Sequence, residues 1–96
     1  MILTKNLSID EILGQIKDIC QRNGVRHLYL FGSYAQGTQT ETSDIDIVVQ
    51  GVKDFDRLNE EIQNIPTLKT IDLFVYENCL NPYLREEIQS NAKQIY

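Results

Sequence analysis

The sequence predicts one small α+β domain in which helices flank a mixed β-sheet. Apolar patterns of helical and of strand period follow one another in the order helix, strand, turn, strand, helix, strand, helix, which is typical of a layered sheet-and-helix fold. The chain has 96 residues, which leaves room for a single core, so residues 1–96 are expected to form one domain. Hydrophobic residues make up 42% and charged residues 24%, the composition of a globular rather than a disordered protein.

The first helix is expected over residues 7–23. Ser8 and Glu11 have the spacing of a capping box at its start. Gly24 is a natural stop at its end, because glycine readily adopts the left-handed conformation that closes many helices. One apolar face recurs at helical spacing and comprises Ile9, Ile12, Leu13, Ile16 and Ile19.

The strands are expected in the middle of the chain. They cover residues 27–31 (HLYLF), 44–49 (DIDIVV) and 68–76 (LKTIDLFVY), with a polar segment over residues 32–43 between the first two. A helix is expected over residues 54–65. This helix should turn four apolar side chains inward: Phe55, Leu58, Ile62 and Ile65.

A last helix is expected to begin after Asn81. Asparagine is a preferred N-cap, and Pro82 suits the first turn because its fixed φ matches the helix. Leu84 and Ile88 are the apolar positions of this helix.

Charge and hydropathy argue against several classes of protein. The chain has 14 acidic and 9 basic residues and a formal net charge of −5, which argues against binding nucleic acid or an anionic membrane through net charge. No segment approaches the ~20 apolar residues of a membrane span, and Asp10 and Glu11 stand where the apolar core of a signal peptide would run. Cys20 and Cys79 form no metal-binding or redox motif and are expected to be reduced, buried thiols. Together these features predict a cytoplasmic protein.

Three aspartates are the candidate metal ligands. Period-2 alternation puts Asp44 and Asp46 on the same face of one expected strand, with Cα atoms ~6.5–7 Å apart at normal strand rise. Magnesium is commonly held by one or two carboxylates together with substrate phosphates and water. Asp72 lies on the third expected strand and would join the pair if that strand lies beside the second. A solvated strand edge would also account for such acids, so the pattern alone leaves both interpretations open.

Gly32 and Ser33 follow the first expected strand at a strand-to-helix turn. Glycine lets the backbone approach a ligand closely. The N–H groups at the start of a short helix, together with the Ser33 hydroxyl, would suit a phosphate oxygen. A Gly-Ser pair after a strand also occurs in plain turns.

These residues combine into one spaced motif: Gly32-Ser33, ten residues, then Asp44-x-Asp46, with Asp72 on a later strand. In this motif the chain resembles the nucleotidyltransferase domain of the DNA polymerase beta superfamily, and more narrowly the minimal nucleotidyltransferases of bacteria and archaea. The resemblance covers nearly the whole chain, from the first helix to the tail LREEIQSNAKQIY.

The resemblance implies a role for each residue of the motif. Asp44 and Asp46 would hold two magnesium ions, and Asp72 would act on the metal that activates the acceptor hydroxyl. Gly32 and Ser33 would bind the β and γ phosphates of ATP. A hydroxyl would attack the α-phosphorus and release pyrophosphate, a reaction suited to two metals because they clamp the attacking and leaving oxygens.

The chain departs from the family at two positions of the motif. The family often reads GSRARG where this chain reads GSYAQG, so Tyr34 and Gln36 replace two arginines. Arginine binds phosphate through paired, charged hydrogen bonds. Arg26, Lys53 and Lys69 are candidate substitutes, and each would also fit a solvated surface charge.

Three functions are compatible with the resemblance. Minimal members are commonly paired with a small helical HEPN protein, often an RNase toxin, so the first is an antitoxin that transfers AMP from ATP to a tyrosine of that toxin. The second is a non-catalytic antitoxin or adaptor that masks the partner by binding. The third is the catalytic half of a two-subunit transferase acting on a small molecule. The three carboxylates favour catalysis, because a pure binding module has no physical need of them.

Overall fold

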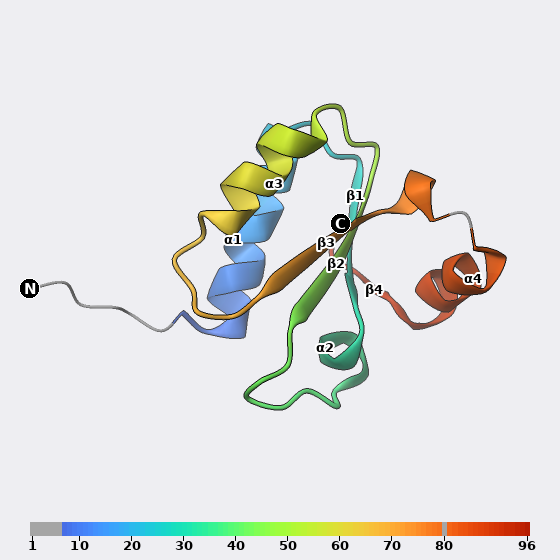
Figure 1. Cartoon of the computed structure of the whole chain (residues 1–96), viewed down its shortest axis with the longest axis horizontal. Coiled ribbons are helices and arrows are strands. Elements are labelled where there is room, and N and C mark those ends of the chain that lie inside the picture. The colour runs from blue at the N-terminus through green and yellow to red at the C-terminus, as the bar shows by residue number, and fades with distance from the viewer. Residues whose placement is uncertain (1–6, 80) are drawn as a thin grey trace, which may run out of the picture.

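Four strands form one sheet in the order β3-β2-β1-β4 (Figure 1). The computed structural model describes residues 7–79 and 81–96. Its elements are α1 (Ile9–Arg22), β1 (His27–Phe31), α2 (Ser33–Gln36), β2 (Ile45–Gln50), α3 (Phe55–Gln63), β3 (Ile71–Val75), the 3-10 turn η1 (Tyr76–Asn78), α4 (Pro82–Asn91) and β4 (Lys93–Gln94). β2 runs antiparallel to β1 and parallel to β3, so the expected mixed sheet with flanking helices is confirmed.

Side-chain caps set the start of the three longer helices. At α1 the Ser8 hydroxyl accepts a hydrogen bond from the Glu11 N–H at 3.1 Å, and the Glu11 carboxylate accepts one from the Ser8 N–H at 3.2 Å. Asp54 and Asn81 cap α3 and α4 in the same way, each accepting a backbone N–H bond. Such caps pair N–H groups that the helix itself leaves without an acceptor. The capping residues read from the sequence are therefore confirmed.

The main core lies between one face of the sheet and the helices α1 and α3, which Figure 1 shows together on that side. The residues with no exposed surface that form it are Ile12, Ile16, Cys20, Leu28, Ile45, Ile47, Val49, Leu58 and Ile62. Because side chains alternate across a strand, this burial assigns every other residue of β1 and β2 to the opposite face. Asp46 is one of those residues.

The opposite face is covered in part by α4, which Figure 1 shows on the far side of the sheet from α1 and α3. Ile88 of α4 packs with Val48 of β2 and with Cys79 in a second, smaller cluster. Both Cys20 and Cys79 are buried and unpaired, as expected, and burial raises the pKa of the Cys20 thiol to about 12. Within the ranges that the structure describes, no helix has the length and apolar character needed to cross a membrane.

Several expected boundaries are wrong by a few residues. The first helix begins at Ile9, β2 begins at Ile45 rather than at Asp44, and α3 ends at Gln63 rather than at residue 65. The third strand is shorter than residues 68–76, and Leu68 is 88% exposed because it lies in the loop before β3.

Phe55 is 41% exposed, although the helical pattern predicted that it points inward. It is the first residue of α3, and the inward face of that helix is taken by Leu58 and Ile62, which are fully buried. Ile65 is buried as expected, but it lies beyond the end of the helix.

β4 is absent from the elements expected from the sequence. It pairs antiparallel with Tyr29 and Leu30 of β1 and so forms the edge strand opposite β3. A strand of two residues is too short to show a period-2 pattern. The chain end beyond it is held by Tyr96, whose hydroxyl donates a hydrogen bond to the carbonyl oxygen of Val25 at 2.9 Å.

Candidate active site

Three aspartates gather at one end of the sheet face that lies opposite the main core. The strand register sets Asp46 of β2 between Phe31 of β1 and Asp72 of β3. Asp44 lies two residues before Asp46, just outside β2, where strand alternation assigns it to the same face. Asp46 and Asp72 are half-buried, whereas Asp44 is exposed. The third strand therefore does lie beside the second, as the interpretation of Asp72 required.

The carboxyl of Asp46 lies in a repulsive electrostatic environment. Burial raises its pKa above the ordinary value of 3.8, and the charge of Asp72, a hydrogen bond with Asp72 and the charge of Asp44 raise the pKa further. Carboxylates this close oppose each other's ionisation, whereas a cation among them favours the charged forms. The cluster thus has the electrostatics of a site that a bound cation would stabilise.

The donor set suits a hard divalent cation such as magnesium, which prefers oxygen ligands. Across residues 7–79 and 81–96, no three Asp, Glu, His or Cys side chains converge tightly enough to form a metal cage by themselves. Magnesium seldom uses such a cage, because substrate phosphates and water usually complete its coordination around one or two carboxylates. The three aspartates therefore fit an ion shared with a phosphate ligand, not an ion enclosed by protein.

Gly32 brings the backbone of the next turn against this cluster. A Cβ atom at Gly32 would lie 2.5 Å from Oδ2 of Asp46. Gly32 also has φ 72° and ψ −149°, a combination that glycine alone adopts readily. α2 begins at the next residue, Ser33, and its turn is closed by the N–H groups of Ala35 and Gln36, which donate to the Gly32 carbonyl at 3.1 and 3.2 Å. The fold thus places Gly32 directly beside Asp46, and Ser33 follows Gly32 as the first residue of α2.

The three cations expected to compensate for the missing arginines lie at opposite ends of the sheet. Arg26 precedes β1 and Lys53 follows β2, and these two strand ends meet in the antiparallel pair. β1 is five residues long, so this end lies about 13 Å from the carboxylate end at normal strand rise. Arg26 and Lys53 are therefore wrong as substitutes. Lys69 lies at the carboxylate end, where it lines one cavity together with Asp44.

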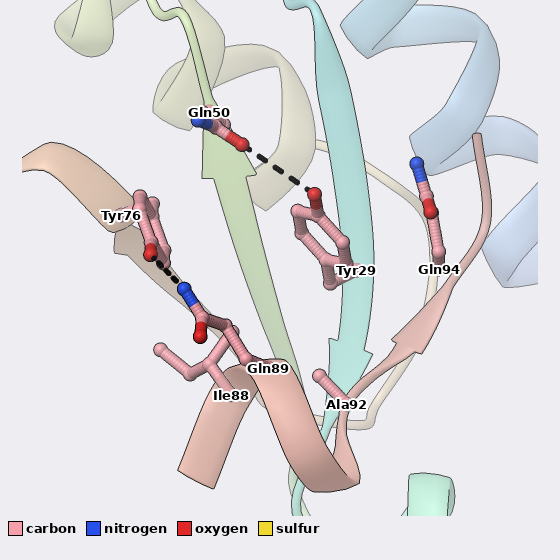
Figure 2. A pocket seen from close by; sticks show the side chains of 7 residues that line it. All are labelled: Tyr29, Gln50, Tyr76, Ile88, Gln89, Ala92 and Gln94. Atoms are coloured by element: carbon pink, nitrogen blue, oxygen red, sulfur yellow. Dashed lines mark hydrogen bonds between the residues drawn. The ribbon is translucent and has the colours of Figure 1, made fainter. Parts of the chain in front are cut away.

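A second cavity, of about 380 Å³, lies between α4 and the other end of this sheet face (Figure 2). The Tyr29 hydroxyl donates a hydrogen bond to Oε1 of Gln50 at 3.4 Å, and Nε2 of Gln89 donates one to the Tyr76 hydroxyl at 2.9 Å. Both bonds are drawn in Figure 2. No sequence motif singles out these phenols and amides. They come from four different elements and share no spacing along the chain, so only the fold brings them together.

The close approach of Gly32 to Asp46 can be tested by glycine-to-alanine substitutions. Gly32→Ala should destabilise the protein by at least about 2 kcal/mol, because the backbone is strained and the carboxylate must move. Gly37→Ala, with φ 75° but nothing within 4 Å of the new Cβ, should cost about 1 kcal/mol. Gly14→Ala, inside α1 with open space around it, should stabilise by about 0.5–1 kcal/mol. Urea unfolding measures all three, and equal losses for Gly32→Ala and Gly37→Ala would contradict the contact.

The repulsion at Asp46 predicts a pH-dependent effect of Asp46→Asn. The folded protein holds this proton more tightly than the unfolded chain, so the stability contributed by the carboxyl is present below about pH 4 and is lost as the pH rises through the raised pKa. Without divalent cations, Asp46→Asn should therefore raise the melting temperature at pH 7, and the difference should shrink near pH 4. The exposed control Glu86→Gln should change little. A lower melting temperature for Asp46→Asn at pH 7 would refute the repulsion.

Known proteins are similar to this chain in sequence and in fold. The family model for "Polymerase beta, Nucleotidyltransferase" matches residues 14–96. A putative protein adenylyltransferase of Methanocaldococcus jannaschii is 35% identical over 94 residues, which cover 93% of this chain and 99% of that protein.

Solved structures agree with the sequence match. A crystal structure of a toxin-antitoxin with AMP-PNP superposes with a TM-score of 0.68 at 26% identity, over 86% of this chain and 71% of that one. The MntA-HpeT toxin-antitoxin mutant with two aspartates, two positions apart, changed to glutamate gives a TM-score of 0.69 at 25% identity, over 86% and 70%. Because the family model matches residues 14–96 and the relative from Methanocaldococcus jannaschii is 35% identical over 93% of this chain, the chain belongs to the polymerase beta nucleotidyltransferase family.

Proposed function

We propose that this chain is a magnesium-dependent protein adenylyltransferase, the antitoxin of a toxin-antitoxin pair, and that it transfers AMP from ATP to a tyrosine of a HEPN-type RNase toxin. The relative from Methanocaldococcus jannaschii supports the transferase part of the proposal, because it is named a putative protein adenylyltransferase and is covered over 99% of its length. The toxin-antitoxin structures support the partner, and one of them contains AMP-PNP.

The observation that carries the proposal is the placement of Asp46 between Asp72 and Gly32. Asp72 is its register partner on β3, and the Gly32 Cα lies close enough that a Cβ there would meet the Asp46 carboxylate at 2.5 Å. A ligand that contacts the turn at Gly32 and the acid on β3 must therefore pass over Asp46. The MntA-HpeT mutant changes two aspartates with the same spacing as Asp44 and Asp46.

Each residue then has a proposed role. Asp44 and Asp46 hold magnesium, of which the family resemblance implies two ions, and Gly32 and Ser33 bind the β and γ phosphates of ATP. Asp72, the register partner of Asp46, is the third carboxylate ligand of the metal site and helps to place the acceptor tyrosine hydroxyl. When bound, the metal supplies positive charge that offsets the charge developing on the phosphate oxygens. The hydroxyl oxygen bonds to the α-phosphorus and loses its proton to solvent, and the bond from that phosphorus to the bridging oxygen breaks, so that pyrophosphate leaves.

We propose that residues 1–96 form a single domain and that a separate protein binds to it. The open end of the sheet face carries acids and a phosphate-binding turn, while the helix α4 packs at the other end. A second protein is therefore proposed to bring the acceptor hydroxyl to Asp72. We place the pair in the cytoplasm, where ATP, magnesium and the RNA cut by an RNase toxin are found together.

Intact mass spectrometry of a co-expressed HEPN partner tests the transfer. With the wild-type chain the partner should gain the mass of one or more AMP groups, and peptide mapping should place them on tyrosine. Asp72→Asn should reduce the modification at least about a hundredfold, because loss of a group that acts at the reacting atoms costs about 3 kcal/mol or more. The complex should still form, since the substitution removes charge from the site and not apolar contact area.

The control is Asp56→Asn, an exposed carboxylate in the first turn of α3, which should leave the modification unchanged. A partner that is neutralised by the wild-type chain yet carries no AMP would refute the transferase and leave masking by binding as the function. Efficient transfer to a small hydroxyl compound by the chain alone would instead favour a small-molecule transferase.

A further inference from the structure

The fold places the side chain of Lys69 at the carboxylate end of the sheet, although Lys69 is far in sequence from Gly32, Asp44 and Asp46. It lies in the loop between α3 and β3, and its own N–H donates to the Thr67 hydroxyl at 3.1 Å, which fixes the loop locally. Its Nζ donates to the carbonyl oxygen of Glu41 at 3.2 Å. The same Nζ lies 5.7 Å from the ring centroid of Tyr34, in the first turn of α2. The ammonium is thus held between α2 and the turn that precedes β2.

That turn and the Lys69 loop line an open cavity of about 410 Å³ that Asp44 borders. Its lining comprises Glu41, Thr42, Ser43, Asp44, Leu68, Lys69 and Thr70. The turn is held by its own hydroxyls: the Thr40 N–H donates to Oγ of Ser43 at 2.8 Å. The cavity is therefore bordered on one side by a candidate metal ligand and on the other by a positive charge.

The other described cations near the sheet lie away from the aspartates or bond to other groups. Arg26 and Lys53 lie at the far end of β1 and β2. Arg85 donates to the Cys79 carbonyl at 2.6 Å and stacks on Tyr76. Lys93 pairs in register with Leu30, a core residue, which assigns it to the opposite face from Asp46. Lys69 is thus the described cation held next to Tyr34, and Tyr34 and Gln36 in α2 carry no charge.

We propose that Lys69 binds the terminal phosphates of the nucleoside triphosphate. The Tyr34 ring, 5.7 Å from Nζ, holds the ammonium in place. The proposal rests on the proposed function and adds a phosphate ligand to that site. An ammonium has three donors, so the bond to Glu41 leaves donors for phosphate oxygens. A cation within about 6 Å of an aromatic face is attracted to it, which limits the freedom of a long side chain. Its charge also offsets repulsion between the triphosphate and the three aspartates.

Isothermal titration calorimetry of the full chain with magnesium and AMP-PNP tests the proposal. Lys69→Met should weaken binding about tenfold, the size of loss typical for one charged hydrogen bond. Lys69→Arg should stay within a few-fold of wild type, because it restores the charge. Lys53→Met, the control at the other end of the sheet, should bind like wild type. All variants should melt at nearly the same temperature as wild type.

Each other result counts against the proposal. Unchanged binding by Lys69→Met overturns it and leaves the proposed function standing. Equal losses for Lys69→Arg and Lys69→Met show that the charge is not what the site uses, which also overturns it. If the wild-type chain itself does not bind magnesium and AMP-PNP, the proposed function fails, and the role of Lys69 fails with it.

Discussion

The sheet holds like charges together on one face, and the packing of the opposite face fixes their positions. Asp46 is half-buried beside Asp72 and near Asp44, and burial and both charges raise the pKa of its carboxyl. This cluster of half-buried carboxylates does not help packing, because it costs stability that apolar residues in the same positions would supply. Cations that accompany a phosphate ligand would remove the repulsion. The same carboxylates that destabilise the free protein would then bind the ligand.

The one-sided core keeps these charges together. Residues such as Ile45 and Ile47 are fully buried under α1 and α3, so the β2 register cannot slip by one residue without moving Asp46 into the core. Because α3 crosses over between β2 and β3, the two strands run parallel and set Asp46 beside Asp72. The stability of the fold and the geometry of the site therefore come from the same strand pairing.

Much of this architecture can be predicted from local patterns in the sequence. The capping residues, the three main strands and the faces of Asp44 and Asp46 follow from periods of 3.6 and 2, which depend on neighbours along the chain. What the sequence could not predict depends on contacts between distant segments. Phe55 has the spacing of a core residue but lies 41% exposed, and the two-residue β4 exists only because β1 offers it a partner. The sequence does not distinguish Lys69 from Arg26 and Lys53, because its contact with Tyr34 exists only in the folded chain.

A thermal shift experiment tests the claim that the aspartates bind magnesium jointly with nucleotide phosphates. The wild-type chain should melt at a distinctly higher temperature with magnesium and AMP-PNP together than with either alone. At a hundredfold excess over Kd the gain is about 2.7 kcal/mol, or on the order of 10 °C for a domain of this size. The Asp44→Asn, Asp46→Asn double variant should be folded and show no such gain. An equal gain in the double variant, or a full gain from AMP-PNP without magnesium, would contradict the claim.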